Sequence, residues 1–185
     1  MSSLTYQKML FENDADVPRL AEIYQEPEIA RYLSISDNYF HYVTNNENVH
    51  FYKVYNNGEM IGTTHLEQQG IVLFMDVLVF PKFQRVGLGT QIIRDIQDDI
   101  FQLGYENIEI SIDEANTASL RLACLQASRP LRHRPLSLTL LIPPTGIIPP
   151  KRANSILTHH LKAVIIFIPP LPPVLTVKAL LPKTI

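Results

Sequence analysis

The chain has 185 residues and a formal net charge of −2, so its length fits one domain with a sizeable core and its charge argues against a simple nucleic-acid-binding protein. One cysteine excludes an internal disulfide and a cysteine-based metal cluster. All 18 acidic residues lie in 1–114, together with seven basic ones, whereas 115–185 holds nine basic residues and no acidic one. Eleven of the 14 prolines lie from Pro130 onward. These two parts, at −11 and +9, are therefore interpreted separately.

The sequence predicts neither export nor insertion into a membrane. Its first residues show no basic segment followed by an apolar one, so no secretory signal is predicted and a cytoplasmic protein is expected. The apolar run 161–181 has the length of a membrane span, but it contains four prolines, which remove hydrogen-bond donors that lipid cannot replace.

Hydrophobic periodicity predicts alternating strands and helices up to about Leu122. Asn57-Gly58 is a strong β-hairpin signal between two strands, and the almost wholly apolar run 71–80 is typical of a strand covered on both faces. The order indicates an α/β fold with a mixed sheet. In chain order, the expected elements are a strand over 4–10, helices beginning at 13–18 and 26–28, an irregular or partly helical segment over 34–48, strands over 50–55, 59–67 and 71–80, a helix over 88–103 capped by Gly104, a strand over 107–112, and a helix from Asn116.

The pattern changes after Leu122. Residues 123–185 form a basic, proline-rich tail whose one clean strand-like run is 163–168. An interaction arm would fit the charge and proline, but the many leucine and isoleucine residues are unlike a solvated linker. A frameshifted or read-through product explains this composition better, and we treat 1–122 as the folded domain.

The segment 79–90 runs from a buried strand through a turn straight into a helix. Backbone N–H groups at a helix start lack intrahelical partners and carry the positive end of the helix dipole, so they favour an anion. Gly87 and Gly89 leave room for a phosphate. The segment lacks the Gly-Lys-Ser/Thr of a Walker loop, and Ile92 occupies the third glycine position of the dinucleotide fingerprint.

Val79-x-Pro81 followed by Gln84-x-x-Gly87-x-Gly89 resembles motif A of the GNAT superfamily of acetyl-CoA-dependent N-acetyltransferases, and the resemblance covers about residues 1–122. It implies a mostly antiparallel sheet flanked by helices, with acetyl-CoA as co-substrate. Asn116 opens a segment similar to the family's next motif, Asn-x-x-Ser/Ala-x-x-Leu, and its side chain is implied to contact the coenzyme. The implied coenzyme-binding residues are Leu78, Val79, Gln84, Arg85, Val86, Gly87, Leu88, Gly89, Thr90 and Asn116.

The end of the chain departs from the family pattern. The helix that begins at Asn116 usually continues with a tyrosine that protonates the leaving thiolate, and two further strands usually complete the sheet. Here the helix continues with Ala123 and Cys124, so the C-terminal strands are missing or replaced. Cys124 could donate the proton in principle, although a lone cysteine on a helix is more often a packed residue.

Acetyl transfer to an amine needs a base, donors for the oxyanion and an acid. In the family the base is often a carboxylate or histidine on the third or fourth strand. Asp76 is therefore the first candidate, with a structural carboxylate as its alternative interpretation; Glu67 and His65 come second, with a solvated hairpin face as theirs.

The sequence therefore predicts a cytoplasmic N-acetyltransferase that moves an acetyl group from acetyl-CoA to a primary amine of a small molecule or peptide. The charge of −11 over 1–114 favours a cationic acceptor. No metal, nucleic acid or membrane partner is expected, and a homodimer is left open. The alternatives are a truncated coenzyme A-binding homologue without turnover and a non-enzymatic interaction module.

Overall fold

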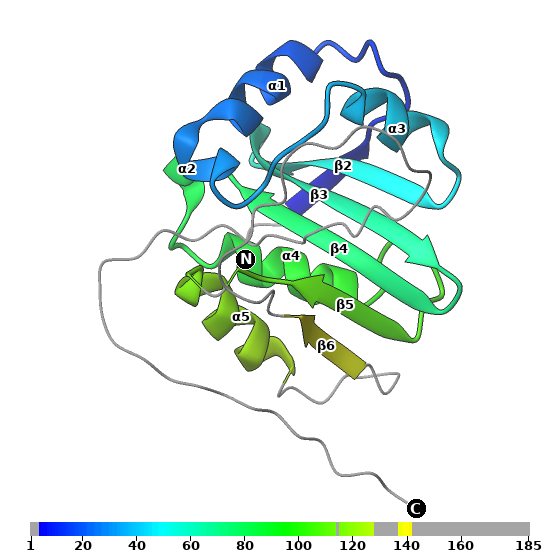
Figure 1. Cartoon of the computed structure of the whole chain (residues 1–185), viewed down its shortest axis with the longest axis vertical. Helices are drawn as coiled ribbons and strands as arrows, with labels where there is room; N and C mark the ends of the chain where they lie inside the picture. Colours follow the sequence, from blue (N-terminus) through cyan, green and yellow to red (C-terminus); the bar gives the residue numbers. More distant parts are fainter. Residues whose placement is uncertain (1–3, 114, 128–136, 142–185) are drawn as a thin grey trace, which may run out of the picture.

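The computed structural model describes residues 4–113, 115–127 and 137–141 (Figure 1). Its helices are α1 (Val17–Gln25), α2 (Pro27–Ala30), α3 (Tyr39–Asn45), α4 (Leu88–Gln97) and α5 (Thr117–Ala127), with a 3-10 turn η1 (Pro81–Phe83). Its strands are β1 (Leu4–Lys8), β2 (Val49–Asn56), β3 (Glu59–Gln69), β4 (Val72–Val79), β5 (Asn107–Ser111) and β6 (Ser137–Leu141).

The strands form one sheet whose spatial order follows the chain, from β1 to β6. Within β1 to β4 each strand is antiparallel to the next, whereas β5 is parallel to β4 and β6 is parallel to β5. The expected mixed, mostly antiparallel sheet flanked by helices is confirmed. The hairpin is confirmed as well: Asn57 and Gly58 both have positive φ, of 52° and 82°, as a type I′ turn requires.

Each face of the sheet carries its own hydrophobic cluster. On one face, which we call the α4 face, α4 and α5 pack against alternate residues of β3, β4 and β5. On the other, the α1–α3 face, helices α1 to α3 pack against β2 and the end of β4. Figure 1 shows α1 to α3 along the β2 side of the sheet and α4 behind β4. Alternation along β4 divides its side chains between the two layers, because Leu73 and Met75 belong to the first cluster and Leu78 to the second.

The structure corrects the expected end of the helix over 88–103. Helix α4 ends at Gln97, because Asp99 adopts a left-handed φ of 50° and its carboxylate accepts hydrogen bonds from the N–H groups of Leu103 (2.8 Å) and Gly104 (3.0 Å). An aspartate that bonds the backbone in this way competes with the helix. Gly104 therefore closes a turn and does not cap α4.

Strand β6 is a second difference, because the sequence pattern predicted no strand there. Its residues pair with β5 from Asn107↔Ser137 to Ser111↔Leu141. The strand-like run 163–168 that the pattern did single out lies outside the described residues. The segment 34–48, expected to be irregular or partly helical, contains α3.

Candidate active site

The loop between β4 and α4 is tied to the end of β4 by one buried side chain. Gln84 is 9% exposed, and its Nε2 donates a 2.7 Å hydrogen bond to the carbonyl of Val79. The turn η1 lies between these two residues. The Gln84 side chain is thus placed to hold the loop against the strand, and its role toward the coenzyme stays a prediction.

The loop then turns sharply into α4 through two left-handed residues. Arg85 has φ 67° and Gly87 has φ 88°, and Gly87 is the N-cap residue of α4. A non-glycine residue at positive φ costs on the order of 1–2 kcal/mol and is typical of functional loops. Among the described residues no side chain caps the helix, so its first N–H groups have neither a helical partner nor a capping group there. With the helix dipole, this arrangement suits a phosphate.

The two central strands separate beside this loop. The ladder between β4 and β5 runs only from Val72↔Asn107 to Phe74↔Glu109, whereas β4 continues to Val79. Because the N–H of Phe80 bonds to Ile61 on β3, alternation directs the backbone groups of Val77 and Val79 away from β3, toward the gap. The same alternation turns the backbone groups of Leu78 toward β3. Leu78 stays a predicted contact, and Val77, which the motif did not identify, joins Val79 at the gap.

A glycine on β3 sets the position of the end of β4. The register between β2 and β3 shifts between Val54 and Tyr55, and Gly62 pairs with both Val54 and Val79. A Cβ at Gly62 would overlap the carbonyl oxygen of Leu78. Any larger residue would therefore push β4 away at the point where it borders the gap.

The second family motif begins at the N-cap of α5. Asn116 is 1% exposed, and its Oδ1 accepts the N–H of Ser119 at 3.2 Å, as an N-cap asparagine does. Its contact with the coenzyme stays a prediction. Cys124 is half-buried on the same helix, which continues past the composition break at Leu122 to Ala127.

The α1–α3 face carries the predicted catalytic residues. Asp76 and His65 are directly paired across β3 and β4, and Glu67 lies two residues farther along β3 on the same face. All three are buried, with exposures of 6%, 2% and 8%. The structure therefore brings the predicted carboxylates and histidine together, and Glu67 and His65 do not lie on a solvated hairpin face.

Three tyrosines from the helical layer meet three alternate residues of β3. The Tyr24 hydroxyl lies 2.9 Å from Thr63 Oγ1, the Tyr39 hydroxyl lies 2.9 Å from His65 Nδ1, and the Tyr42 hydroxyl donates to Glu67 Oε2 at 2.8 Å. Burial raises the pKa of all three tyrosines, and burial together with the Glu67 carboxylate raises that of Tyr42 to about 12. The hydroxyls therefore stay protonated at neutral pH. The sequence could not reveal these pairs, because their members are 25 to 39 residues apart.

His65 is held neutral. Burial and, to a lesser extent, the nearby His50 lower the pKa of His65 to about 4. Its Nε2 has no hydrogen-bond partner among the described residues and lies 3.9 Å from Glu67 Oε2. A neutral imidazole beside two carboxylates can donate or accept one hydrogen bond at this nitrogen, depending on its tautomer.

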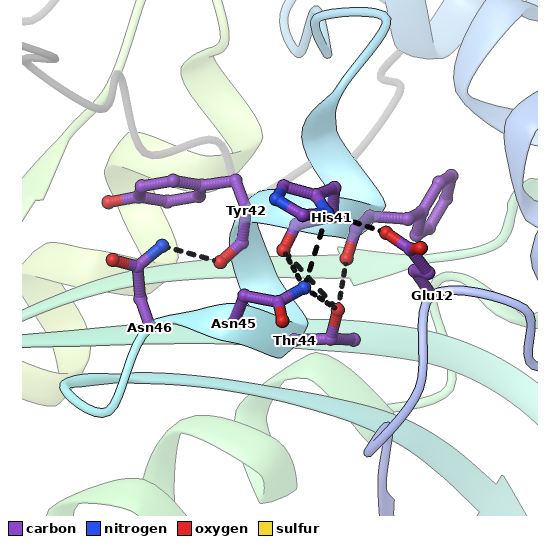
Figure 2. A network of polar contacts seen from close by, with 7 residues as sticks. Glu12, His41, Tyr42, Thr44, Asn45 and Asn46 are labelled. Atoms are coloured by element: carbon purple, nitrogen blue, oxygen red, sulfur yellow. Dashed lines mark hydrogen bonds and ion pairs between the residues drawn. The ribbon is translucent and has the colours of Figure 1, made fainter.

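Helix α3, which supplies Tyr39 and Tyr42, is fixed by polar contacts at its exposed side (Figure 2). His41 Nδ1 lies 2.6 Å from Glu12 Oε2, on the segment after β1, and Asn45 Nδ2 donates to the His41 carbonyl at 2.9 Å. These contacts tie α3 to the chain beyond β1. The position of α3 over the sheet is set by its buried residues Tyr39, Phe40 and Val43, and the contact with Glu12 adds to it at the surface.

Two negative observations apply to the described part of the chain. It contains no helix with the length and apolar character needed to cross a membrane. It also contains no group of three or more histidine, cysteine, aspartate or glutamate side chains arranged to hold a metal ion.

Several solved structures have a similar fold. The aminoglycoside acetyltransferase AAC(6')-Ib, in complex with coenzyme A and kanamycin, matches with a TM-score of 0.55 and 20% identity over 68% of this chain and 83% of that one. The ribosomal-protein-S18-alanine N-acetyltransferase from Escherichia coli matches with a TM-score of 0.53 and 18% identity over 67% and 76%. The aminoglycoside N-acetyltransferase AAC(6')-Iy, in complex with coenzyme A, matches with a TM-score of 0.51 and 13% identity over 72% and 92%. At these identities the likeness shows a shared fold.

Family membership rests on the sequence itself. No curated protein sequence matches the chain. The family model described as acetyltransferase (GNAT) matches residues 17–124, which is more than half of the chain and includes the loop, the gap between β4 and β5, and the start of α5. The chain belongs to the GNAT acetyltransferase family.

Proposed function

We propose that this chain transfers the acetyl group of acetyl-CoA to a primary amine by direct attack in a ternary complex. The observation that carries the proposal is the gap between β4 and β5 beside the uncapped start of α4. The loop N–H groups of residues 85–90 suit the pyrophosphate of the coenzyme. The backbone groups of Val77 and Val79 suit its pantetheine arm, which extends along β4 as an extra strand would.

In this arrangement the thioester lies beside the end of β4 and the acceptor on the α1–α3 face. Asp76 lies two residues before Leu78 on that face, about 7 Å along the strand. Its carboxylate takes a proton from the ammonium form of the acceptor. The free amine then forms a bond to the acetyl carbon and the carbon–sulfur bond breaks. The proton that the new amide nitrogen must lose passes through water to the departing thiolate, which leaves as the free thiol.

A second candidate is a coenzyme A-binding chain without turnover. It is favoured by the sequence of α5, which reads Ala123 and Cys124 where the family resemblance places a tyrosine acid. Without that acid, the thiolate leaves with less help, and acetyl transfer is slowed relative to coenzyme binding.

Titration of the full chain with acetyl-CoA in a calorimeter, followed by an acetyl-transfer assay with a panel of amines, tests both candidates. The panel would include n-butylamine, 1,4-diaminobutane, kanamycin and a peptide with N-terminal alanine. Saturable binding with transfer to at least one amine is the expected result. Binding without transfer would leave only the second candidate, and absence of binding would reject both.

A further inference from the structure

Three acidic or aromatic residues form a row across the sheet. The register pairs Glu67 of β3 with Phe74 of β4, and Phe74 with Glu109 of β5. Their sequence neighbours Leu66, Leu73 and Ile108 are fully buried in the cluster on the α4 face. Because side chains alternate along a strand, all three members of the row lie on the opposite face, with Asp76 and His65.

Phe74 is the centre of this row, and it is only half-buried. Among the described residues it belongs to neither hydrophobic cluster. The cluster on the α1–α3 face contains no described residue of β5, and Glu109, like Phe74, is only partly buried. An accessible aromatic ring with a carboxylate on each side is a suitable site for an organic cation.

The spacing of the row suits a small cation. Neighbouring strands lie about 5 Å apart, so the backbones at Glu67 and Glu109 are about 10 Å apart with Phe74 between them. Both oxygens of Glu67 accept a hydrogen bond, one from Tyr42 (2.8 Å) and one from Gln69 (2.9 Å). Each carboxylate oxygen can accept a second donor, so Glu67 is held in place and still able to bind an ammonium group.

Asp76 lies two residues along β4 from Phe74, which is about 7 Å toward the coenzyme end of the strand. His65 provides an independent sign of a ligand between these points. It is 2% exposed, faces Asp76 across the strands, and its Nε2, without a hydrogen-bond partner among the described residues, lies 3.9 Å from Glu67 Oε2. Buried polar atoms normally have partners, so this nitrogen indicates a polar group that the described part of the chain does not supply.

We infer that Glu67, Phe74 and Glu109 bind a second positive charge of the acceptor, and that the acceptor is therefore a dication with two amino groups about 7 Å apart. The inference rests on the proposed function, because it places the reacting amine at Asp76. The class comprises aliphatic diamines, polyamines and amino sugars with this spacing. The charge of −11 over 1–114 attracts such cations.

The test compares 1,4-diaminobutane with n-butylamine, which has the same carbon chain and one amino group. Each is titrated calorimetrically into the full chain saturated with coenzyme A, and each is assayed as acetyl acceptor. We expect the diamine to bind at least about tenfold more tightly and to have a correspondingly higher kcat/KM, as a charge-assisted contact predicts. Glu109→Gln and Glu67→Gln should each lower this preference severalfold. The matched control, Glu22→Gln on the exposed side of α1, should keep it.

The outcomes separate this inference from the proposed function. Equal binding and equal kcat/KM for the two amines, or a preference that survives both substitutions, would overturn the dication site and leave acetyl transfer intact. If coenzyme A does not bind, the proposed function fails. Titration of the two amines into the chain without coenzyme A would then still test the row of Glu67, Phe74 and Glu109. Equal affinities for the two amines in that titration would overturn the dication site.

Discussion

The two faces of the sheet carry different types of side chain. The α4 face is aliphatic, with isoleucine, leucine and valine from β3 to β5 and α4 in one cluster. The α1–α3 face is aromatic, and it also holds every buried ionisable side chain of the basic, histidine and carboxylate types among the described residues: Lys53, His65, Glu67 and Asp76.

This difference suggests that one face mainly stabilises the fold and that the other holds the candidate catalytic residues. Lys53 is satisfied by Asp14 (2.8 Å) and Asp16 (2.7 Å), so it is a structural ion pair. The other three lie together on β3 and β4, close to the point where β4 separates from β5. Burial of charged and polar groups costs free energy unless they are paired, and an aliphatic layer on the opposite face offsets that cost. The α4 face therefore supports a polar α1–α3 face, where the acceptor is expected.

The largest expected effect comes from Asp76→Asn on the polar face. Loss of a general base lowers kcat by about 10²- to 10⁴-fold, while the affinity for acetyl-CoA, measured by calorimetry, stays within about twofold. Asp37→Asn, at an exposed position before α3, is the matched control and should keep full activity. An Asp76→Asn chain with unchanged kcat would assign Asp76 a structural role.

On the aliphatic face the expected effect is on folding. Ile92→Ala removes a fully buried side chain of α4 and should lower the free energy of unfolding by about 2–5 kcal/mol, measured by urea denaturation. Ile100→Ala, at a position that is 47% exposed, should change it by less than about 1 kcal/mol. Equal losses at the two positions would contradict the assignment of the core to this face.

The pH dependence of stability tests the buried histidine. The pKa of His65 is about 4 in the folded chain and about 6.5 when unfolded, so the unfolded state binds the extra proton between these values. The contribution of His65 to the free energy of unfolding should therefore be fully present above pH 6.5. It should decline, by roughly 3 kcal/mol, as the pH falls toward 4.

The substitution His65→Gln isolates this contribution. Tyr39, Tyr42, Glu67, Asp76 and His50 face or adjoin His65, but these residues remain in the variant. The free energy of unfolding of the wild type minus that of the variant should thus change with pH as expected for the titration of one histidine. A difference that does not change between pH 6.5 and 4 would show that His65 is protonated as easily in the folded chain as in the unfolded one.

The smallest expected effect distinguishes the coenzyme loop from an ordinary turn. Gly87 and Gly58 have similar φ values of 88° and 82°, and at neither position would an added Cβ contact a described residue other than its chain neighbours. Gly87→Ala and Gly58→Ala should each cost about 1 kcal/mol of stability, because both strain the backbone. Only Gly87→Ala should also weaken acetyl-CoA binding. Equal affinities in the two variants would count against the loop as the pyrophosphate site.

Local signals in the sequence predicted much of this fold. Asn57-Gly58 fixed the hairpin, the apolar run 71–80 indicated the central strand, and Gly87 marked the start of α4. The end of α4 was wrong, because the side chain of Asp99 bonds the backbone of Leu103 and Gly104 and outcompetes a continuing apolar pattern. Strand β6 was missed although Pro135 and Pro143 bound its sequence, because the change in composition after Leu122 led us to treat only 1–122 as folded, and because its pairing partner lies on β5.

The candidate site was predictable in its types of residue and not in its contacts. Asp76 and Glu67 were named from the strand pattern and the family resemblance, and the register places them on one face. The tyrosine partners of β3 could not be named, because they depend on how α1 and α3 pack over the sheet. Glu109 was not identified either: only the short parallel ladder between β4 and β5 brings it beside Phe74.

The most direct test of the account is a map of amide chemical shifts recorded by NMR while the full chain is titrated with acetyl-CoA. The account predicts large shifts for residues 85–90 and for Val77 and Val79, with small shifts along β1 and α1. Shifts that spare the loop and the end of β4, or none at saturating acetyl-CoA, would contradict the placement of the coenzyme between β4 and β5.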